Sequence, residues 1–170
     1  MRRTLAAGVV VTALALGPAA ATAAAPEKIT FDGVGQVKLG MTHKQLREKG
    51  LVGKLRKGCE LGGPDTRTAR LRSPLRGSVN YTLNSPRRVT DITITGGATA
   101  RGVGIGDKLK DIKAKFPKRK VDHSQEDVFN AFFVFIPKAN PVGKIKMMFV
   151  IDSDTRKITA IGVPVVQFCE

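Results

Sequence analysis

The stretch VKLGMTHKQLREK, residues 37–49, recurs in outline as VGIGDKLKDIKAK, residues 103–115. When the two stretches are aligned at an offset of 66, apolar residues align with apolar residues, and a glycine aligns with a glycine. A second pair follows, RVTDITI at 88–94 and KITAIGV at 157–163, at an offset of 69. Two ordered matches at nearly one offset indicate an internal tandem repeat. The sequence therefore predicts two units of similar architecture.

The first repeated stretch has the pattern of a short helix in each unit. Thr42 and Gln45 form a capping box, which predicts a helix near 42–49. Asp107 is the expected N-cap of the second helix, near 107–116. Apolar residues at helical spacing place one face of each helix against a core.

Strands are expected after each helix because polar and apolar residues then alternate. A lead-in at residues 26–38 is expected to contain an edge strand around Ile29 and Phe31. The fold class predicted is α+β, with two tandem α-βββ repeats, antiparallel sheets and short packing helices. The predicted units are residues 24–97 and 98–170. The predicted strands cover residues 66–72, 78–83 and 88–94 in the first unit, and 128–136, 144–151 and 157–166 in the second.

The first 23 residues have the pattern of a secretory signal peptide. A basic start is followed by a short apolar run and an Ala-x-Ala end, with cleavage expected after Ala23. The apolar run is shorter than the roughly 20 residues that a membrane-spanning helix needs. We therefore expect a secreted, extracellular protein without a transmembrane anchor, and association with the cell envelope is the alternative.

Two cysteines, Cys59 and Cys169, are present in the chain. In an exported protein the simplest expectation is one disulfide between them. Two free thiols or an intermolecular bridge are the alternatives. No metal site is expected, because there are only two histidines and no Cys-x-x-Cys spacing.

No motif in the sequence predicts catalysis or a cofactor. The glycines at 102, 104 and 106 lack the spacing of a dinucleotide or phosphate loop. No nucleophile elbow is present, and histidine is scarce. A hydrolase would need a cleft lined by His43 or His123 together with carboxylates. We therefore expect a protein that is not an enzyme and binds no cofactor.

Charge is the strongest chemical feature of the chain. Lysine and arginine number 29 against 14 aspartate and glutamate residues, a formal net charge of +15. The basic residues of the second helix and its exit avoid the apolar helix face, so they predict a solvated basic surface. Such a surface favours an acidic protein, an anionic wall polymer or a lipid surface, whereas the export signal disfavours nucleic acid. The candidate binding residues here are Lys108, Lys110, Lys113, Lys115, Lys118, Arg119 and Lys120.

Aromatic side chains supply the other candidates for a binding surface. Phe132 and Phe133 are neighbours in a predicted strand, so they point to opposite faces, and we expect one of them to be exposed. Exposed aromatic residues are typical of interfaces. We add Tyr81, the single tyrosine, to the candidates.

The Gly40-Met41-Thr42 turn, with its counterpart at Gly106-Asp107, opens a short helix that an antiparallel meander is expected to follow. This pattern resembles the helix-plus-sheet units of two known families. One is the outer-membrane assembly lipoprotein BamE, and the other is the tandemly repeated β-lactamase inhibitory proteins secreted by actinomycetes. The resemblance implies a helix-plus-sheet architecture and a binding role. The inhibitors are expected to carry a disulfide within each repeat and BamE a lipidated cysteine, and this chain has neither pattern. No inhibitory residue is carried over.

These observations together predict a secreted, non-enzymatic protein-interaction module. Inhibition of an extracellular enzyme is one specific version of that role, with an unidentified extracellular protein as the partner. The alternative is a basic envelope-associated protein that binds an anionic cell-wall polymer or lipid surface.

Overall fold

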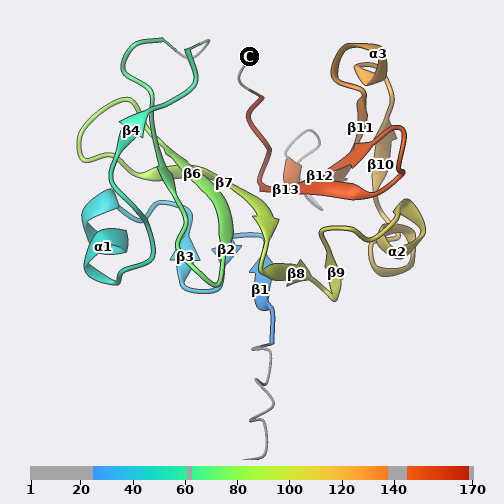
Figure 1. Ribbon diagram of the computed structural model, residues 1–170, viewed down its shortest axis with the longest axis horizontal. Coiled ribbons are helices and arrows are strands. Elements are labelled where there is room, and N and C mark those ends of the chain that lie inside the picture. The colour runs from blue at the N-terminus through green and yellow to red at the C-terminus, as the bar shows by residue number, and fades with distance from the viewer. Residues whose placement is uncertain (1–24, 61–62, 138–144, 169–170) are drawn as a thin grey trace, which may run out of the picture.

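The computed structural model describes residues 25–60, 63–137 and 145–168 of the protein. It combines helices with mostly antiparallel sheets, so the predicted α+β class is confirmed (Figure 1). The helices are α1 (His43–Glu48), α2 (Leu109–Lys115) and α3 (Glu126–Phe129). The strands are β1 (Glu27–Thr30), β2 (Gly33–Val34), β3 (Val37–Lys38), β4 (Arg56–Lys57), β5 (Arg67–Arg70), β6 (Arg76–Tyr81), β7 (Val89–Gly96), β8 (Ala98–Ala100), β9 (Val103–Gly104), β10 (Lys120–Asp122), β11 (Ala131–Pro137), β12 (Ile145–Asp152) and β13 (Ile158–Val163).

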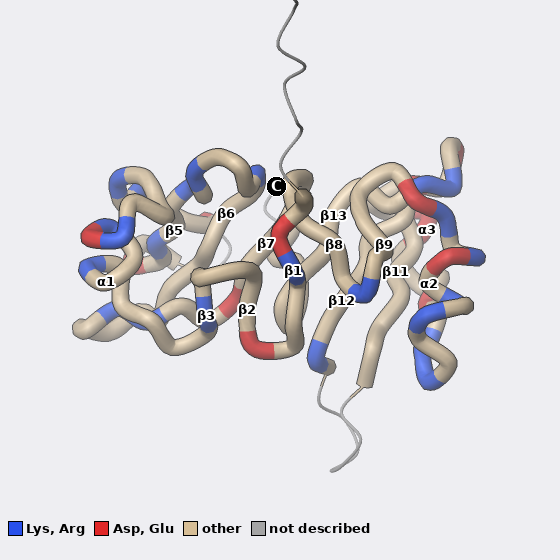
Figure 2. The backbone as a smooth tube through the Cα atoms, turned by 90° about the horizontal axis from the view of Figure 1, so that it is seen from below, with Lys and Arg blue, Asp and Glu red and all other residues tan. Residues whose placement is uncertain are grey.

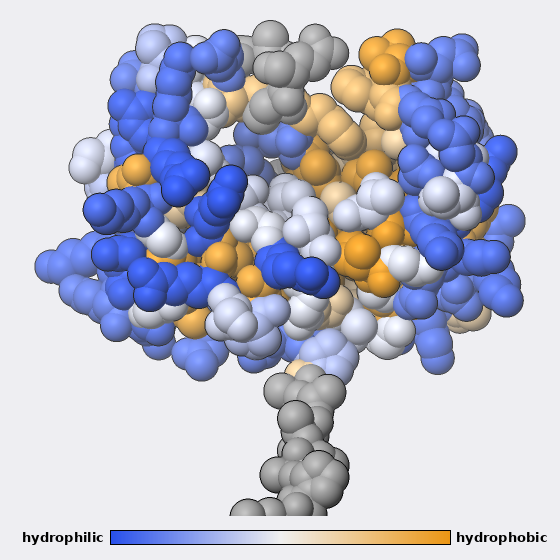
Figure 3. All heavy atoms as spheres, in the orientation of Figure 1, coloured by the Kyte–Doolittle hydropathy of each residue, from blue (hydrophilic) through white to orange (hydrophobic). Residues whose placement is uncertain are grey.

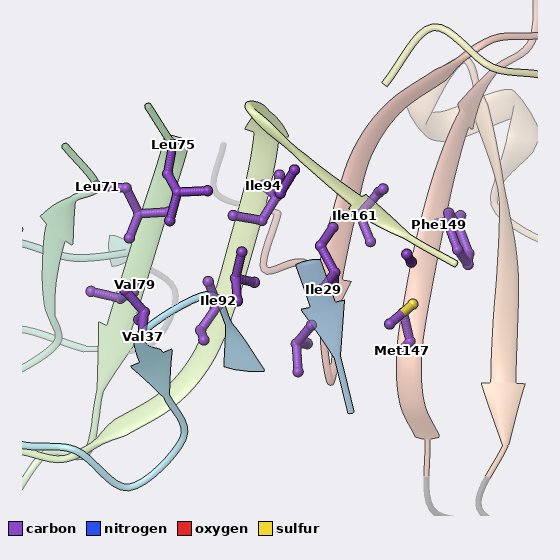
Figure 4. Close-up of a cluster of buried hydrophobic side chains, with 14 of the residues drawn as sticks. Ile29, Val37, Leu71, Leu75, Val79, Ile92, Ile94, Met147, Phe149 and Ile161 are labelled. Carbon is purple, nitrogen blue, oxygen red and sulfur yellow. The ribbon is translucent and has the colours of Figure 1, made fainter. Parts of the chain in front are cut away.

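The larger sheet has eight strands in the order β10-β11-β12-β13-β7-β6-β5-β4. Its centre is the antiparallel pair of β13 and β7, in which Ile161 lies opposite Ile94 and Val163 opposite Ile92. Successive side chains of a strand alternate between the two faces of a sheet. One face of the central strands therefore carries apolar side chains, which Figure 4 shows packed as a buried cluster.

The smaller sheet has five strands in the order β3-β2-β1-β8-β9. Strands β1 and β8 pair in parallel, with Glu27 opposite Ala98. The predicted edge strand around Ile29 and Phe31 is therefore corrected in two respects. The strand ends at Thr30, and it lies inside a sheet because it has a hydrogen-bonded neighbour on each side. The parallel pair is also a departure from the purely antiparallel sheets that were predicted.

Helix α1 begins where the capping box predicted. The amide of Gln45 donates to the Thr42 hydroxyl at 3.2 Å, and the amide of Thr42 donates to Gln45 Oε1 at 2.8 Å. In α2 the N-cap is Lys108, so the predicted Asp107 cap is wrong. The reason is that the Asp107 carboxylate instead accepts a hydrogen bond from the amide of Gly104 at 2.8 Å, which stabilises the turn before the helix.

Several short elements were absent from the predictions, among them β2, β3, β8 and β9 of the smaller sheet. The short strands β4 and β10 extend the two ends of the large sheet, and α3 precedes β11. The strand predicted from residue 128 accordingly begins at Ala131. Two- and three-residue strands carry too few alternations to be seen as a pattern, so only pairing with a neighbour reveals them.

Both halves of the chain contribute to one main hydrophobic core. The core cluster takes residues from the small sheet, from α1 and α2 and from one face of the large sheet. The other face of the large sheet is concave, because the strands at both ends rise on either side of the C-terminal segment (Figure 1). We call this concave side the outer face.

Candidate binding face of the large sheet

The outer face carries two chemically different halves. On β5, β6 and β7 it presents Thr68, Arg70, Ser78, Asn80 and Thr93, which we call the polar half. On β11, β12 and β13 it presents Phe133, Phe135, Met148, Val150 and Ala160, which we call the aromatic half. Figure 3 shows hydrophobic atoms toward the β11 side of the molecule and hydrophilic atoms toward the β4 side.

Strand register aligns the members of each half. Arg70 lies opposite Ser78, and Ser78 lies opposite Thr93, so three strands present polar side chains in a row. In the aromatic half Phe133 lies opposite Val150. The sequence signal for the polar half was the period-two alternation of β5, β6 and β7. Sequence reasoning missed it as a site because alternation does not reveal which strands become neighbours.

The C-terminal segment, residues 164–168, packs on the aromatic half. The ring of Phe168 lies 5.2 Å from that of Phe133 and 4.8 Å from that of Phe129, measured between ring centroids. A Cβ atom on Gly162 would collide with the backbone of Val165 and Val166, so the segment crosses directly over β13. These contacts remove most of the aromatic half from solvent.

The polar half holds an open pocket of about 450 Å³. Arg56 and Arg70 line it, together with Ser78, Asn80 and Thr93. In the described part of the chain neither arginine forms an ion pair, whereas the neighbouring Lys57 is paired with Glu60 at 2.9 Å. Lys57 and Glu60 also line the pocket and pair with each other. Among the described residues, the pocket therefore offers two guanidinium groups without an ion pair, beside this lysine–glutamate pair and neutral hydrogen-bonding side chains.

Asp91 is the buried acidic residue beside this pocket. Burial raises the pKa of its carboxyl group, while hydrogen bonds from Asn80 and Thr90 oppose that rise. The donors are Asn80 Nδ2 at 2.6 Å and the Thr90 hydroxyl at 3.0 Å. The carboxylate thereby fixes the amide of Asn80 at the pocket wall.

Cys59 lies where the polar half meets the C-terminal segment. Its Sγ atom is 3.7 Å from the carbonyl oxygen of Phe168, the residue that precedes Cys169. Cys169 itself lies outside the described residues, as do the predicted signal peptide at 1–23 and its cleavage site. The disulfide stays a prediction, and the position of Phe168 supports it.

The three aromatic binding candidates are buried. Tyr81 is 4% exposed, and its ring meets that of His43 edge-on at 5.7 Å. Burial raises the pKa of the Tyr81 phenol to about 12. Phe132 and Phe133 do point to opposite faces, but they are 1% and 5% exposed. The expectation that one of them is exposed is wrong, because the core covers Phe132 and the C-terminal segment covers Phe133.

The predicted basic surface is present on and after α2. The helix buries Ile112, and its lysines are exposed. Figure 2 marks basic positions in blue along α2 and after it. Arg119 is half-buried, and the other basic candidates are exposed. Those exposed residues are Lys108, Lys110, Lys113, Lys115, Lys118 and Lys120.

Neither histidine lines a cavity described here. His43 is the first residue of α1, and its Nε2 lies 3.2 Å from the carbonyl oxygen of Gly53. His123 Nδ1 lies 2.6 Å from Glu126, and the Ser153 hydroxyl donates to the same carboxylate at 2.6 Å. The hydrogen bonds from Ser153 and His123 lower the pKa of Glu126. The carboxylate thus stands between serine and histidine, whereas activation of a serine requires the histidine in that place.

Comparisons with known proteins find no counterpart. No family model matches the chain, and no curated protein and no solved structure matches it either. Among the described residues, no group of three or more His, Cys, Asp or Glu side chains could hold a metal ion. No helix in that part of the chain is long and apolar enough to cross a membrane.

Proposed function

We propose that the protein is an exported, non-enzymatic protein-interaction module that binds its partner on the polar half of the outer face. The open pocket with the unpaired Arg56 and Arg70 carries the proposal. An arginine without a counter-charge favours a carboxylate, which its guanidinium group binds through two parallel hydrogen bonds. The partner surface is therefore acidic, and inhibition of an extracellular enzyme is one specific version of this role.

The composition of the polar half supports protein binding over general attraction. Ser78, Asn80 and Thr93 supply directional hydrogen-bonding groups on the strands next to the two arginines. Arginine is also among the residue types that contribute most binding energy in protein interfaces. A concave face lets loops at both ends of the sheet contact the same partner, which increases the buried area.

We infer further that the chain is a tandem repeat of one unit. The amide of Gly40 donates to Val89 at 2.8 Å, and the amide of Gly106 donates to Ile158 at 2.9 Å. These pairs are related by the offsets of 66 and 69 found in the sequence. The mirrored order of β4–β7 and β10–β13 in the sheet also supports the repeat. The unit would then be one helix followed by four strands.

A tandem repeat is also what the resemblance to the β-lactamase inhibitory proteins implies. That resemblance makes a secreted enzyme with an acidic surface the first partner class to test. In this proposal the two units have diverged, because one half of the outer face is open and polar and the other is covered.

The test is a pull-down with immobilised mature protein, residues 24–170, from the secreted and envelope fractions of the organism that produces it. We expect wild type to retain one protein through a high-salt wash. The variant Arg56→Glu/Arg70→Glu should release it, because both guanidinium groups become carboxylates that repel an acidic partner.

A charge-matched control separates the pocket from net charge. Lys49 and Arg72 are exposed and do not line the pocket, so Lys49→Glu/Arg72→Glu should bind as wild type does. Equal retention by the pocket variant and wild type would contradict the proposal. Release of every bound protein by salt would also contradict it, since such release indicates charge alone.

A second candidate function uses the basic surface of α2. Its exposed lysines form no ion pair among the described residues, which favours an anionic wall polymer or lipid head groups. Binding of this kind depends on summed charge and weakens steeply with ionic strength. Lys110→Gln/Lys113→Gln/Lys115→Gln should then lose retention on anionic vesicles, while three Lys→Gln changes away from α2, at Lys44, Lys49 and Lys54, should reduce retention less.

A further inference from the structure

A second pocket lies on the opposite side of the large sheet from the outer face. Its volume is about 340 Å³, and Phe31, Phe116 and Ile136 form much of its wall. A smaller cavity of about 240 Å³ shares Phe31 and Phe116 and continues the apolar wall toward Met147. In Figure 2 the ends of β11 and β12 lie between the β1–β2 turn and α2.

Three basic side chains surround this apolar wall. The guanidinium carbon of Arg101 lies 5.1 Å from the ring centroid of Phe116, and Lys146 Nζ lies 4.8 Å from that of Phe31. Lys118 also lines the pocket. Contact with an aromatic face holds a cation beside apolar surface without neutralising it.

No acidic residue is among the described residues that line the pocket. None of the three cations forms an ion pair in the described part of the chain, and Arg101 donates one hydrogen bond, to the carbonyl of Lys115 at 3.2 Å. Asp32, next to Phe31 in the sequence, is instead held by the hydroxyl of Thr30 at 2.5 Å. The site therefore has unused positive charge.

We propose that this pocket binds a small amphipathic anion, a carboxylate with a hydrocarbon tail such as a medium-chain fatty acid. The tail would pack against Phe31, Phe116 and Ile136, and the carboxylate would lie between Arg101 and Lys146. An apolar wall disfavours a fully hydrated anion such as phosphate, because burying its charge without apolar contacts costs free energy. The volume lies at the lower end of the ~300–1,000 Å³ range of ligand pockets, which suits one short tail.

The test is calorimetric titration of the mature protein with sodium octanoate. We expect saturable binding at one site. Acetate lacks the tail and octyltrimethylammonium reverses the charge, so neither should bind measurably. Arg101→Gln should weaken octanoate binding at least tenfold, and so should Lys146→Gln, which covers the case that one variant fails to fold. Lys113→Gln removes the same charge from the exposed face of α2 and should leave the affinity unchanged.

The methionines supply a readout of position. Met147 borders the cavity, whereas the adjacent Met148 points to the outer face. With methyl-labelled methionine, octanoate should shift the NMR signal of Met147 and leave that of Met148 in place. Four results would each overturn the proposal. They are failure of octanoate to saturate, equal binding of the ammonium analogue, unchanged affinity in both Arg101→Gln and Lys146→Gln, and a shift confined to Met148.

Discussion

The polar half and the aromatic half of the outer face belong to one continuous sheet, yet different neighbours meet them. Phe133 and Met148 lie under the C-terminal segment, whereas Arg70 and Ser78 face an open pocket. Apolar area removed from water contributes roughly 25 cal/mol per Å², so covering the aromatic half stabilises the fold. Burying polar side chains in the same way would add little to the stability of the fold. The comparison teaches that the covered half of this face contributes stability, while the polar half stays open to solvent.

The largest effect expected concerns the link between the two halves. If Cys59 and Cys169 form a disulfide, it closes a loop of about 110 residues, which stabilises by about 4–5 kcal/mol in the chain-entropy model. Cys59→Ser should therefore lower the free energy of unfolding by about that amount, measured by denaturant titration without reductant. Reductant should destabilise wild type and leave the variant unchanged. Two reactive thiols in the native oxidised protein would contradict the pairing.

The second effect compares one residue from each half. Phe133→Ala removes a buried ring that contacts Phe129, Phe135 and Phe168, and should cost about 3–5 kcal/mol of unfolding free energy. Ser78→Ala, at a polar-half position that is only partly buried, should change it by less than about 0.5 kcal/mol. Similar losses for both variants in denaturant titrations would remove the distinction between the halves.

A third, smaller effect tests what covers the aromatic half. Phe168→Ala removes a half-buried ring, which should destabilise by about 1–2 kcal/mol because only part of its area is buried. The exposed aromatic half should then bind a hydrophobic fluorescent dye more strongly than wild type does. Gln167→Ala, one residue earlier and exposed, is the control and should bind no more dye than wild type. Unchanged fluorescence in Phe168→Ala would show that the segment does not protect this surface.

The smallest expected effect is the change in stability with pH that is due to Asp91, beside the polar half. Burial raises the pKa of Asp91, so the folded protein binds this proton more tightly than the unfolded chain does. The stability from this group is present below the unfolded pKa near 3.8 and is lost as pH rises through the folded pKa. Asp91→Asn removes the titration. Its stability relative to wild type should therefore rise from pH 3 to pH 7, measured by denaturant titration at each pH. A constant difference would contradict the raised pKa.

Local chemistry accounts for the parts of the structure that were predictable. The capping box of Thr42 and Gln45 involves residues within one helical turn, and the alternation of polar and apolar residues in β6 and β7 involves only residues of the same strand. Long-range pairing accounts for the failures. The parallel partner of β1 lies about 70 residues away, and no local pattern of Glu27–Thr30 encodes it.

The sequence by itself determined the α+β class, the position of α1 and the basic outward side of α2, because these depend on capping, periodicity and charge over short distances. Only the tertiary structure decided which face stays open. Phe132 and Phe133 point to opposite faces as predicted, but Phe168 packs on Phe133 from 35 positions further along the chain. Arg56 and Arg70 become one pocket only when β4 pairs with β5. Contacts between distant segments determine exposure, and exposure determines which residues are available to bind.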